Sequence, residues 1–318
     1  MEISGNKTEY IKDKARELGF DLCGIAPAGP LKYNEEILRN WVSKGMNAAM
    51  EYMARDIEKR ADPSKLLPGA KSVIVTGLNY YTEKKQGGGD IPSLSIYAYG
   101  KDYHEVIMER LNKLVEYIGQ LDKDAFSRGF VDSSPILEKA WASRAGIGWQ
   151  GKHSVLINNK IGSFFFLGIV LTNLELDYDQ PARDNCGSCH LCIDACPVSA
   201  INDNNTIDAR KCIAYLTINN KAPVDEADAA KLDGMIIGCD RCQEVCPWNR
   251  KALPHGHPEF DIPDEIRRMS ANDWLNLSKE DFIRLFASSP LKQRKYDVFI
   301  KNVTNVTKFL KVNPGCRQ

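Results

Sequence analysis

Eight of the ten cysteines fall into a spacing that few folds can accommodate. The first run reads Cys186-x2-Cys189-x2-Cys192-x3-Cys196-Pro197. This is the run of bacterial-type ferredoxins, in which two-residue spacers let three thiolates of one tight loop reach three irons of one cubane. The fourth cysteine, which stands three residues further on and before proline, ligates the other cluster. The spacing therefore predicts two four-iron, four-sulfur clusters.

A second, partial copy of the run completes the ligand sets. Cys212 is followed by Cys239-x2-Cys242-x3-Cys246-Pro247. Because the last cysteine of each run serves the other cluster, the ligation crosses. The predicted sets are Cys186, Cys189, Cys192 and Cys246 for the first cluster, and Cys196, Cys212, Cys239 and Cys242 for the second. Zinc is the alternative metal, since paired CxxC motifs also build zinc ribbons, but the uninterrupted CxxCxxCxxxCP run favours iron–sulfur.

Two of the ten cysteines lie outside these ligand sets. We expect no disulfide in this chain, because the sequence indicates a reducing compartment. The N-terminus has no apolar signal segment, and no run of 18 apolar residues exists, so we expect a cytoplasmic protein without a membrane span. In a reducing compartment cysteines serve metals more often than disulfides. Cys23 stands in an apolar stretch and is predicted to be a buried, inert thiol, and Cys316 is assigned no role.

The length of 318 residues and the order of patterned segments predict three structural units. Residues 1–175 are expected to form an α/β (α+β) sandwich, residues 176–260 the two-cluster module, and residues 261–318 a short helical segment. In the first unit we expect helices at 10–18, 34–44, 102–121 and 134–145, and strands at 20–26, 71–81, 94–99, 126–131, 154–157 and 163–172. The last two strands would flank a turn at 158–160. In the tail, 281–287 and 298–310 are predicted helices.

Two clusters side by side form an electron relay, because four thiolates on each cubane leave no open position for a substrate. A separate redox cofactor or partner must therefore receive the electrons. No GxGxxG stands between a strand and a helix, so a Rossmann dinucleotide site lacks support. The three glycines of the stretch 145–153 would let backbone approach a large ligand, although an ordinary glycine-rich turn is the simpler interpretation.

Asp132 stands at the end of an apolar strand and before a predicted helix. On local chemistry alone, a helix-capping aspartate is the favoured interpretation. The alternative is a general acid whose pKa is raised by apolar surroundings. The five histidines show no HxxH or HExxH pattern, so each is expected to be structural or on the surface.

The chain resembles the epoxyqueuosine reductases of tRNA modification, a family related to cobalamin-dependent reductive dehalogenases. The blocks that carry the resemblance are DIEKR at 56–60, GKDYH at 100–104, VD at 131–132, EKA at 138–140, RAGIG at 144–148, GS at 162–163, CGSC at 186–189, GCDRCQ at 238–243, HPE at 257–259 and SPLK at 289–292. They are spread over nearly the whole chain. The cysteine run alone is shared with many ferredoxins, so these flanking blocks make the resemblance specific.

The resemblance implies reduction of epoxyqueuosine to queuosine at the wobble position of tRNA. It implies base-off cobalamin as reaction centre, held between the first domain and the clusters, and Asp132 as proton donor. The positions expected at the corrinoid are Arg60, Ser95, Asp132, Leu156, Asn158, Leu167, Asp240 and Arg241. Two positions depart from the family pattern: many members have a polar or basic residue at Ile96 and a serine at Ala214.

The implied partners are tRNA carrying epoxyqueuosine and an external electron donor such as a flavodoxin or ferredoxin, and we expect a monomer. Two other functions fit the cluster pattern. One is a cobalamin-dependent reductive dehalogenase or other small-molecule reductase, and the other is a non-catalytic two-cluster electron-transfer protein. Dehalogenases usually carry export signals, so the N-terminus of this chain favours the tRNA enzyme.

A local excess of positive charge marks the C-terminal segment, although Lys+Arg and Asp+Glu both number 42 over the whole chain. From 288 to 318 the basic residues are Lys292, Arg294, Lys295, Lys301, Lys308, Lys311 and Arg317, against one acid, Asp297. A solvated helix face would account for such a run. If the substrate is a folded RNA, the same residues would contact phosphates, and Lys292→Glu with Lys295→Glu would weaken tRNA binding without loss of cobalamin or clusters.

Overall fold

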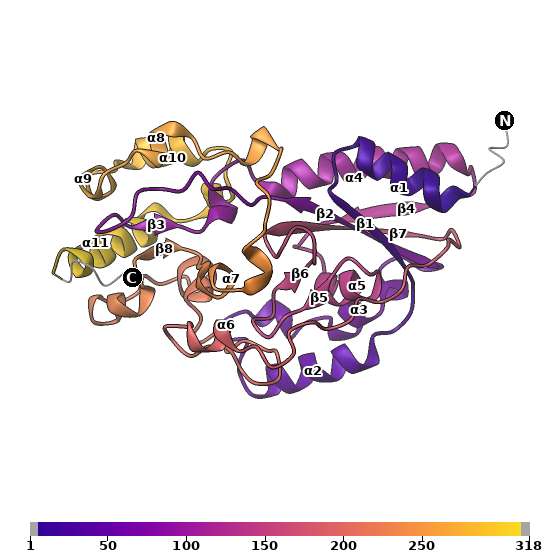
Figure 1. The fold of residues 1–318 in the computed structure, drawn as a ribbon, viewed down its shortest axis with the longest axis horizontal. Coiled ribbons are helices and arrows are strands. Elements are labelled where there is room, and N and C mark those ends of the chain that lie inside the picture. The colour runs from indigo at the N-terminus through magenta and orange to yellow at the C-terminus, as the bar shows by residue number, and fades with distance from the viewer. Residues whose placement is uncertain (1–5, 313–318) are drawn as a thin grey trace.

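A four-stranded antiparallel sheet forms the centre of the N-terminal part of the molecule in this computed structural model, which describes residues 6–312 (Figure 1). The strand order is β1-β2-β7-β4, with β1 at Leu22–Pro27, β2 at Ser72–Asn79, β7 at Phe165–Thr172 and β4 at Ser127–Phe130. Every residue of β2 is buried, because helices cover both faces of the sheet. The apolar runs at 71–81 and 163–172 therefore form the two central strands, as predicted.

Alternate residues of the central strands enter two separate cores, as the period of a strand requires. Ile74 and Val170 face the helices α1 (Lys7–Glu17) and α4 (Tyr103–Leu121). Val73 and Val75 face α5 (Glu138–Arg144) on the other side. Figure 1 shows α1 and α4 above the sheet, and α2 (Lys32–Ser43), α3 (Ile57–Ala61) and α5 below it. The predicted apolar face of helix 102–121 is confirmed, since Val106, Leu111, Leu114 and Ile118 are all buried.

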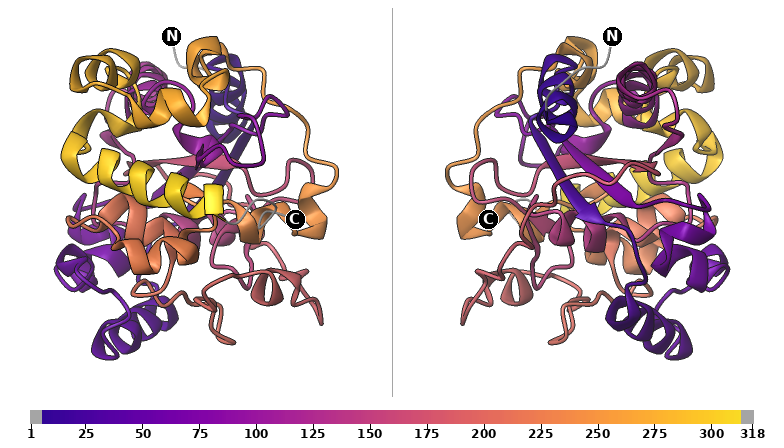
Figure 2. Two further views of the ribbon diagram at one scale, coloured as in Figure 1. Left: turned by 90° about the vertical axis from the view of Figure 1, so that its left-hand side faces the viewer. Right: turned by 90° about the vertical axis from the view of Figure 1, so that its right-hand side faces the viewer.

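The two-cluster module joins the N-terminal part through backbone pairing. Strand β3 (Ser93–Leu94) runs parallel to β8 (Met235–Ile237). The short helices α6 (Leu191–Asp194) and α7 (Arg241–Glu244) each begin within the two cysteine runs. The views from the two ends of the molecule show these loops on the side of the sheet opposite α1 and α4 (Figure 2). The cysteine runs are thereby held against the lower helices of the N-terminal part.

The tail is helical, as predicted, and packs onto this joint. It comprises α8 (Asp264–Arg267), α9 (Ala271–Leu275), α10 (Lys279–Phe286) and α11 (Tyr296–Val312). Trp274, Phe286 and Phe299 belong to the same buried cluster as Ile107 and Ile237. One continuous core thus contains residues of all three predicted units, and the boundaries near 175 and 260 stay predictions. No helix within residues 6–312 is both long and apolar enough to cross a membrane.

Three expected elements differ in the structure. The strand expected at 94–99 ends at Leu94 and gives way to a 3-10 turn at Ile96–Ala98, because the backbone amide of Ile96 donates to Asp240. The helix expected from 134 starts at Glu138, because the backbone amide of Leu137 bonds to the Arg60 carbonyl. The two strands expected around the turn at 158–160 are both present, but the first is shorter than predicted.

The segment at 154–157 pairs outside the main sheet. Strand β6 (Leu156–Ile157) lies against β5 (Trp149–Gln150). Between β6 and β7 only the bridge between Asn158 and Gly162 remains. The Asn158 side chain accepts bonds from the backbone amides of Lys160 and Ile161, which closes a turn and directs the chain into the main sheet.

The remaining short helical turns connect these elements. They are Glu51–Met53, Pro63–Lys65, Tyr215–Asn219, Glu226–Leu232, Pro247–Asn249, Pro258–Phe260 and Pro290–Gln293. The turn at 215–219 is of π type, and the others are 3-10 turns.

Candidate functional site

A cavity of about 580 Å³ opens between the N-terminal part and the cysteine module. From the N-terminal part, Arg60, Asp132, Glu138 and Lys139 line it, together with apolar residues of α2 and α5. From the module the lining includes Cys196, Cys212, Cys239 and Cys242. These four are the set that the crossed spacing predicts for the second cluster. Residues from distant parts of the chain therefore share one cavity.

Thiols of the two cysteine runs affect one another electrostatically. Burial, and then the nearby Cys246, Cys186 and Cys189, raise the pKa of Cys192. Burial, followed by Cys239 and Cys212, raises the pKa of Cys242 well above its ordinary value. Each of these two thiols is influenced mainly by members of its own predicted ligand set, and Cys192 also acts on Cys242, so the two ligand sets stay predictions. Thiolates are the ligands of iron–sulfur clusters, so thiols with raised pKa values gain their charge only when metal compensates for burial.

Cys23 lies apart from both predicted ligand sets. It packs against the core of the N-terminal part, and burial raises the pKa of its thiol to about 12. The charged groups that act on it are Lys12, Asp179, Arg16 and Glu9 and not other thiols, which fits the predicted inert cysteine. Cys316 lies outside the described residues.

Asp132 lies two residues after the end of β4 and adopts a left-handed backbone conformation with φ of 48°. Its side chain is 58% exposed, toward the cavity. The residue that precedes helix α5 is Leu137, and α5 has no side-chain cap, so the interpretation of Asp132 as a capping residue is wrong. Left-handed backbone at a non-glycine residue costs on the order of 1–3 kcal/mol and collects at functional sites.

Two neighbouring residues of α4 hold the Asp132 carboxylate by the same oxygen. The Tyr103 hydroxyl donates to Oδ2 over 2.9 Å, and Nε2 of His104 lies 3.1 Å from Oδ2. The rings of Tyr103 and His104 are stacked at 4.0 Å, and Phe166 of β7 stacks on Tyr103 from the other side at 4.2 Å. The carboxylate is thus positioned by side chains that the sheet itself supports.

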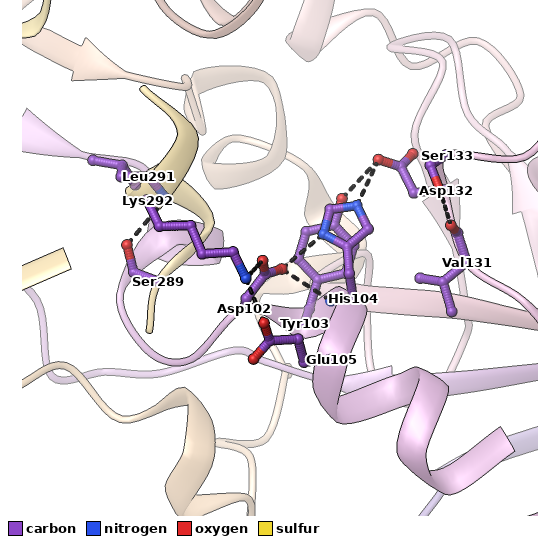
Figure 3. Close-up of polar contacts among 10 residues, drawn as sticks. All are labelled: Asp102, Tyr103, His104, Glu105, Val131, Asp132, Ser133, Ser289, Leu291 and Lys292. Carbon is purple, nitrogen blue, oxygen red and sulfur yellow. Dashed lines mark hydrogen bonds and ion pairs between the residues drawn. The ribbon is translucent and has the colours of Figure 1, made fainter. Parts of the chain in front are cut away.

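His104 continues into a longer polar chain. Its Nδ1 lies 2.7 Å from Oδ1 of Asp102, the N-cap of α4. On the other side of Asp102, Nζ of Lys292 lies 2.8 Å from Oδ2 and also pairs with Glu105. Figure 3 shows Lys292, Asp102, His104 and Asp132 in a row, with Tyr103 beside His104. The row connects the C-terminal segment to the cavity.

The charges of this row decide which carboxyl keeps a proton. The hydrogen bond with His104 is the main reason that the pKa of Asp132 is lowered, against the raising effect of burial. The expectation of a raised pKa at Asp132 is therefore wrong. Burial, and then the Asp132 charge, raise the pKa of Glu138 to about 8. Burial lowers the pKa of the neighbouring Lys139.

The residues expected at the corrinoid fall into two sets. Arg60 and Arg241 line the cavity together with Asp132. The Arg60 guanidinium donates to the Tyr52 carbonyl over 2.8 Å, and Arg241 pairs with Asp233. Three of the expected residues therefore line the same cavity.

The other expected residues do not line this cavity. Ser95 donates to Asp240 over 2.5 Å, and both are buried where β3 meets the module. Leu156 and Leu167 pack into the core below the sheet. Asn158 uses its amide for the Ile147 carbonyl and its oxygen for the turn described above. Direct contacts of these residues with a corrinoid stay predictions.

The glycines at 146, 148 and 151 have local partners. A side chain at Gly148 would meet the Ile157 carbonyl at 2.2 Å, and one at Gly151 would meet the Ile157 side chain at 2.6 Å. Gly146 has φ of 73° and lies against the Gln180 carbonyl. Close contacts within the chain itself account for these glycines. This agrees with the simpler interpretation of an ordinary glycine-rich turn.

Sequence reasoning missed Tyr103, His104, Glu138 and Lys139 as site residues. All four lie in blocks that carry the family resemblance, but His104 was assigned to the structural or surface histidines. The one local signal was an aspartate two residues before the histidine, which reads as an ordinary helix cap. Their convergence on Asp132 depends on the packing of α4 and α5 across β4 and β7.

The basic tail is only partly free. Lys292 is paired with Asp102 and Glu105, and Lys308 lies 3.3 Å from Glu226. Arg294 donates to the carbonyls of Ile218 and Asn220. Lys295, Lys301 and Lys311 are exposed, and Arg317 lies outside the described residues. A phosphate contact by Lys292 would therefore break an existing ion pair.

Two parts of the chain match known family models. Residues 60–133 match the family model described as "Epoxyqueuosine reductase QueG, DUF1730". Residues 185–249 match the model of a 4Fe-4S double cluster binding domain. The module is therefore a double-cluster domain.

Similar proteins match over nearly the full length. The epoxyqueuosine reductase of Cellulophaga algicola is 41% identical over 303 residues, which cover 95% of this chain and 99% of that protein. That of Cyclobacterium marinum is 42% identical over 305 residues, covering 95% and 97%.

Two solved structures share the fold. An epoxyqueuosine reductase in complex with an epoxyqueuosine-modified tRNA-Tyr stem loop has a TM-score of 0.88 at 30% identity, covering 95% of this chain and 81% of that one. The enzyme from Bacillus subtilis, solved with its catalytic loop swung out of the active site, has a TM-score of 0.86 at 28% identity and covers 96% of this chain and 82% of that one.

Proposed function

Because this chain belongs to the epoxyqueuosine reductase family, we propose that the cavity beside Asp132 holds base-off cobalamin and the modified base of tRNA. The enzyme is an oxidoreductase that reduces epoxyqueuosine in tRNA to queuosine. In this chain Asp132 would supply the proton, and the predicted second cluster would supply the electrons. The wobble nucleotide would have to leave its stack to enter the cavity.

The observation that carries the proposal is the shared lining of one cavity. Asp132 lines it from the N-terminal part, and Cys196, Cys212, Cys239 and Cys242 line it from the module. Removal of an epoxide oxygen as water, with a carbon–carbon double bond left behind, consumes two electrons and two protons. A substrate between these two walls would have an electron source on one side and a proton source on the other.

The lining also fits a large, mainly apolar cofactor with polar side groups. Ile37, Leu38, Trp41, Met53 and Ile136 supply apolar surface, while Arg60 and Lys139 supply positive charge. Cofactor sites are typically built in this way, with a few convergent polar groups in an apolar wall. When bound, cobalamin would supply a low-valent cobalt whose reducing power no side chain has. Arg60 and Lys139 would hold its polar side groups.

The loop that carries the first cysteines of the first predicted cluster lies near the surface, where an external electron donor could reach it. Cys186 and Cys189 are only partly buried, and Gly187 and Ser188 between them are exposed. Lys152 secures this loop by donating to the carbonyls of Gly187 and Cys189. A flavodoxin, ferredoxin or similar carrier could reduce the first cluster there, and the second would pass electrons to the cavity. We further propose that the enzyme works as a monomer in the cytoplasm.

The test is reconstitution with iron, sulfide and cobalamin, followed by single turnover of an epoxyqueuosine-containing tRNA stem loop under a chemical reductant. We expect a corrinoid absorption spectrum that remains after gel filtration, and conversion to queuosine detected by mass spectrometry. The matched assay offers a haloaromatic compound in place of RNA. Dehalogenation without RNA turnover would instead support a small-molecule reductase, and failure to retain corrinoid would support an electron carrier.

A further inference from the structure

His104 bridges two carboxylates with its two ring nitrogens. Nε2 lies 3.1 Å from Asp132 and Nδ1 lies 2.7 Å from Asp102. The side chain is 37% exposed, so water reaches its edge, while Asp102 is buried. Asp102 is the N-cap of α4 and Asp132 lies after β4, so the two carboxylates come from different segments of the chain (Figure 3). The geometry fixes the ring from both sides.

The count of donors and acceptors fixes how many protons this bridge holds. Asp102 receives Lys292 at 2.8 Å and the backbone amide of His104 at 3.1 Å, so it is ionised and accepts from Nδ1 of His104. Between Nε2 and Asp132 one proton is then required for a hydrogen bond. It lies either on Nε2, as an imidazolium facing a carboxylate, or on Asp132, as a carboxylic acid facing a neutral ring. In both forms the pair stores one transferable proton.

We propose that His104 is a positioning residue that resupplies Asp132 with its proton, and that Asp102 and Lys292 hold it in the orientation and charge state that allow this. The inference rests on the proposed function, because it concerns the proton of epoxide reduction. It also removes the need for a raised pKa at Asp132 itself. Asp132 transfers the proton to substrate, and His104 stores it.

Reduction of the epoxide requires two electrons and two protons. Two electrons from the external donor, delivered through the clusters, break a carbon–oxygen bond of the epoxide, and the oxygen takes a proton from Asp132. That proton is the one that Nε2 of His104 has already passed to the Asp132 carboxylate, which leaves the ring neutral, and solvent at the exposed edge of the ring then reprotonates Nε2. A second passage of the same kind supplies the second proton, so that oxygen leaves as water and the double bond forms.

Other charged groups also face this pair. Glu138 and Lys139 of α5 act on Asp132, Glu105 of α4 shares Lys292 with Asp102, and the Tyr103 hydroxyl donates to the same oxygen as His104. Burial opposes a charge on His104, but the hydrogen bonds with Asp132 and Asp102 prevail and raise its pKa above 6.5. A raised pKa keeps the ring protonated to higher pH than an ordinary imidazole, which favours the imidazolium form of the bridge.

The experiment uses four variants of the full chain with clusters loaded: His104→Gln, Asp102→Asn, Lys292→Met and the control Lys113→Met. Lys113 forms an exposed ion pair with Glu109 on α4 and has no contact with the row. The first readout is nitrogen NMR of histidine-labelled, oxidised protein, with the His104 signal identified by its loss in His104→Gln. This titration needs neither RNA nor cobalamin.

We expect Asp102→Asn to lower the midpoint of the His104 titration by about one pH unit, as the loss of a neighbouring opposite charge does. Lys292→Met should move the midpoint in the opposite direction, because the Asp102 charge is then less compensated. Lys113→Met should leave it in place. A His104 signal that is neutral at pH 7, or that fails to respond to Asp102→Asn, would overturn the inference.

The second readout is the pH profile of single turnover. His104→Gln keeps a side chain of similar length that cannot supply a proton, so its rate should fall at least about tenfold at pH 8 and less at pH 6, where solvent protonates Asp132 directly. The apparent KM for the stem loop should not change. An unaltered pH profile would refute the role of His104, whereas absence of turnover in the parent protein would instead refute the proposed function.

Discussion

The backbone amide of Asp132 donates a 2.6 Å hydrogen bond to Oε1 of Glu138. The bond holds two carboxyl groups side by side at the cavity and gives them opposite character. His104 lowers the pKa of Asp132, while burial and the Asp132 charge raise that of Glu138 to about 8. Pairs of titratable groups whose environments separate their pKa values are a common arrangement for acid–base chemistry.

Asp132→Asn should lose most turnover while it keeps the fold, the clusters and cobalamin. Asn keeps the size of the side chain but cannot release a proton, and a general acid contributes about 10²–10⁴-fold to rate. The capping role, which Asn would have preserved, is absent from the structure. Single-turnover assays with metal analysis of the same sample measure this.

The companion variant Glu138→Gln separates the two carboxyls. If Asp132 donates the proton, Glu138→Gln should retain at least about a tenth of the parent rate, because its amide still accepts from the Asp132 backbone. The reverse result, with Asp132→Asn active and Glu138→Gln dead, would assign proton donation to Glu138.

Glu138 should also make stability depend on pH. Its pKa is raised from an ordinary 4.5 to about 8 in the folded chain, so the folded state binds the proton more tightly than the unfolded one. The related stabilisation is fully present below pH 4.5 and is lost as pH rises toward 8. Thermal unfolding of Glu138→Gln should therefore show a midpoint above that of the parent at pH 8, with the difference shrinking at pH 5. A constant difference across this range would contradict the raised pKa.

A fully reconstituted chain should contain about eight irons, in two cubanes. Cys186→Ala should damage the first cluster, and Cys212→Ala should damage the second, which lines the cavity. We expect each variant to keep about half of the iron and one set of cluster signals in electron paramagnetic resonance. Only Cys212→Ala should also disturb the spectrum of bound cobalamin. Zinc in place of iron after anaerobic purification would refute the cluster assignment.

Bound cob(II)alamin should show no nitrogen ligand on cobalt. Among the lining residues of the cavity that the structure describes, His153 is the one histidine. Its Nδ1 accepts from the backbone amide of Val155, so Nε2 carries the proton and offers no lone pair. Electron paramagnetic resonance should lack nitrogen superhyperfine splitting and stay unchanged in His153→Gln. Splitting that disappears in His153→Gln would show that this histidine ligates cobalt.

Binding of tRNA should depend on the exposed lysines of the C-terminal segment. The double variant Lys292→Glu with Lys295→Glu would mix two effects, because Lys292 is paired with Asp102. Lys295→Glu with Lys301→Glu changes exposed residues instead. We expect weaker binding of the stem loop and a shallower dependence of affinity on salt, since each lost phosphate contact removes about one unit of slope.

The control for the tRNA surface is Lys44→Glu with Lys123→Glu, which changes two exposed lysines of the N-terminal part by the same total charge. Equal loss in the two double variants would indicate a general effect of charge. Unaltered affinity of the C-terminal variant would place the RNA-binding face on another part of the surface.

The sequence by itself determined the elements whose patterns are local. The spacing of the cysteines predicted the double-cluster domain, because ligand spacing in a tight loop depends only on neighbours in the chain. The apolar run at 71–81 and the amphipathic pattern at 102–121 predicted β2 and α4 for the same reason. Where a distant partner competes for the backbone, the prediction was wrong. Asp240 removes Ile96 from a strand, and the carbonyl of Arg60 binds Leu137 ahead of α5.

Tertiary structure alone decided the chemistry of the site. Nothing local distinguishes Asp132 as a proton donor from Asp132 as a helix cap, because the choice depends on His104 and Tyr103, which come from another helix. Nothing local marks Lys292 as the partner of Asp102, nearly 200 residues away in the chain. The pKa of a carboxyl is set by the charges and burial around it, and these are fixed only when α4, α5 and the C-terminal segment pack against one sheet and one module.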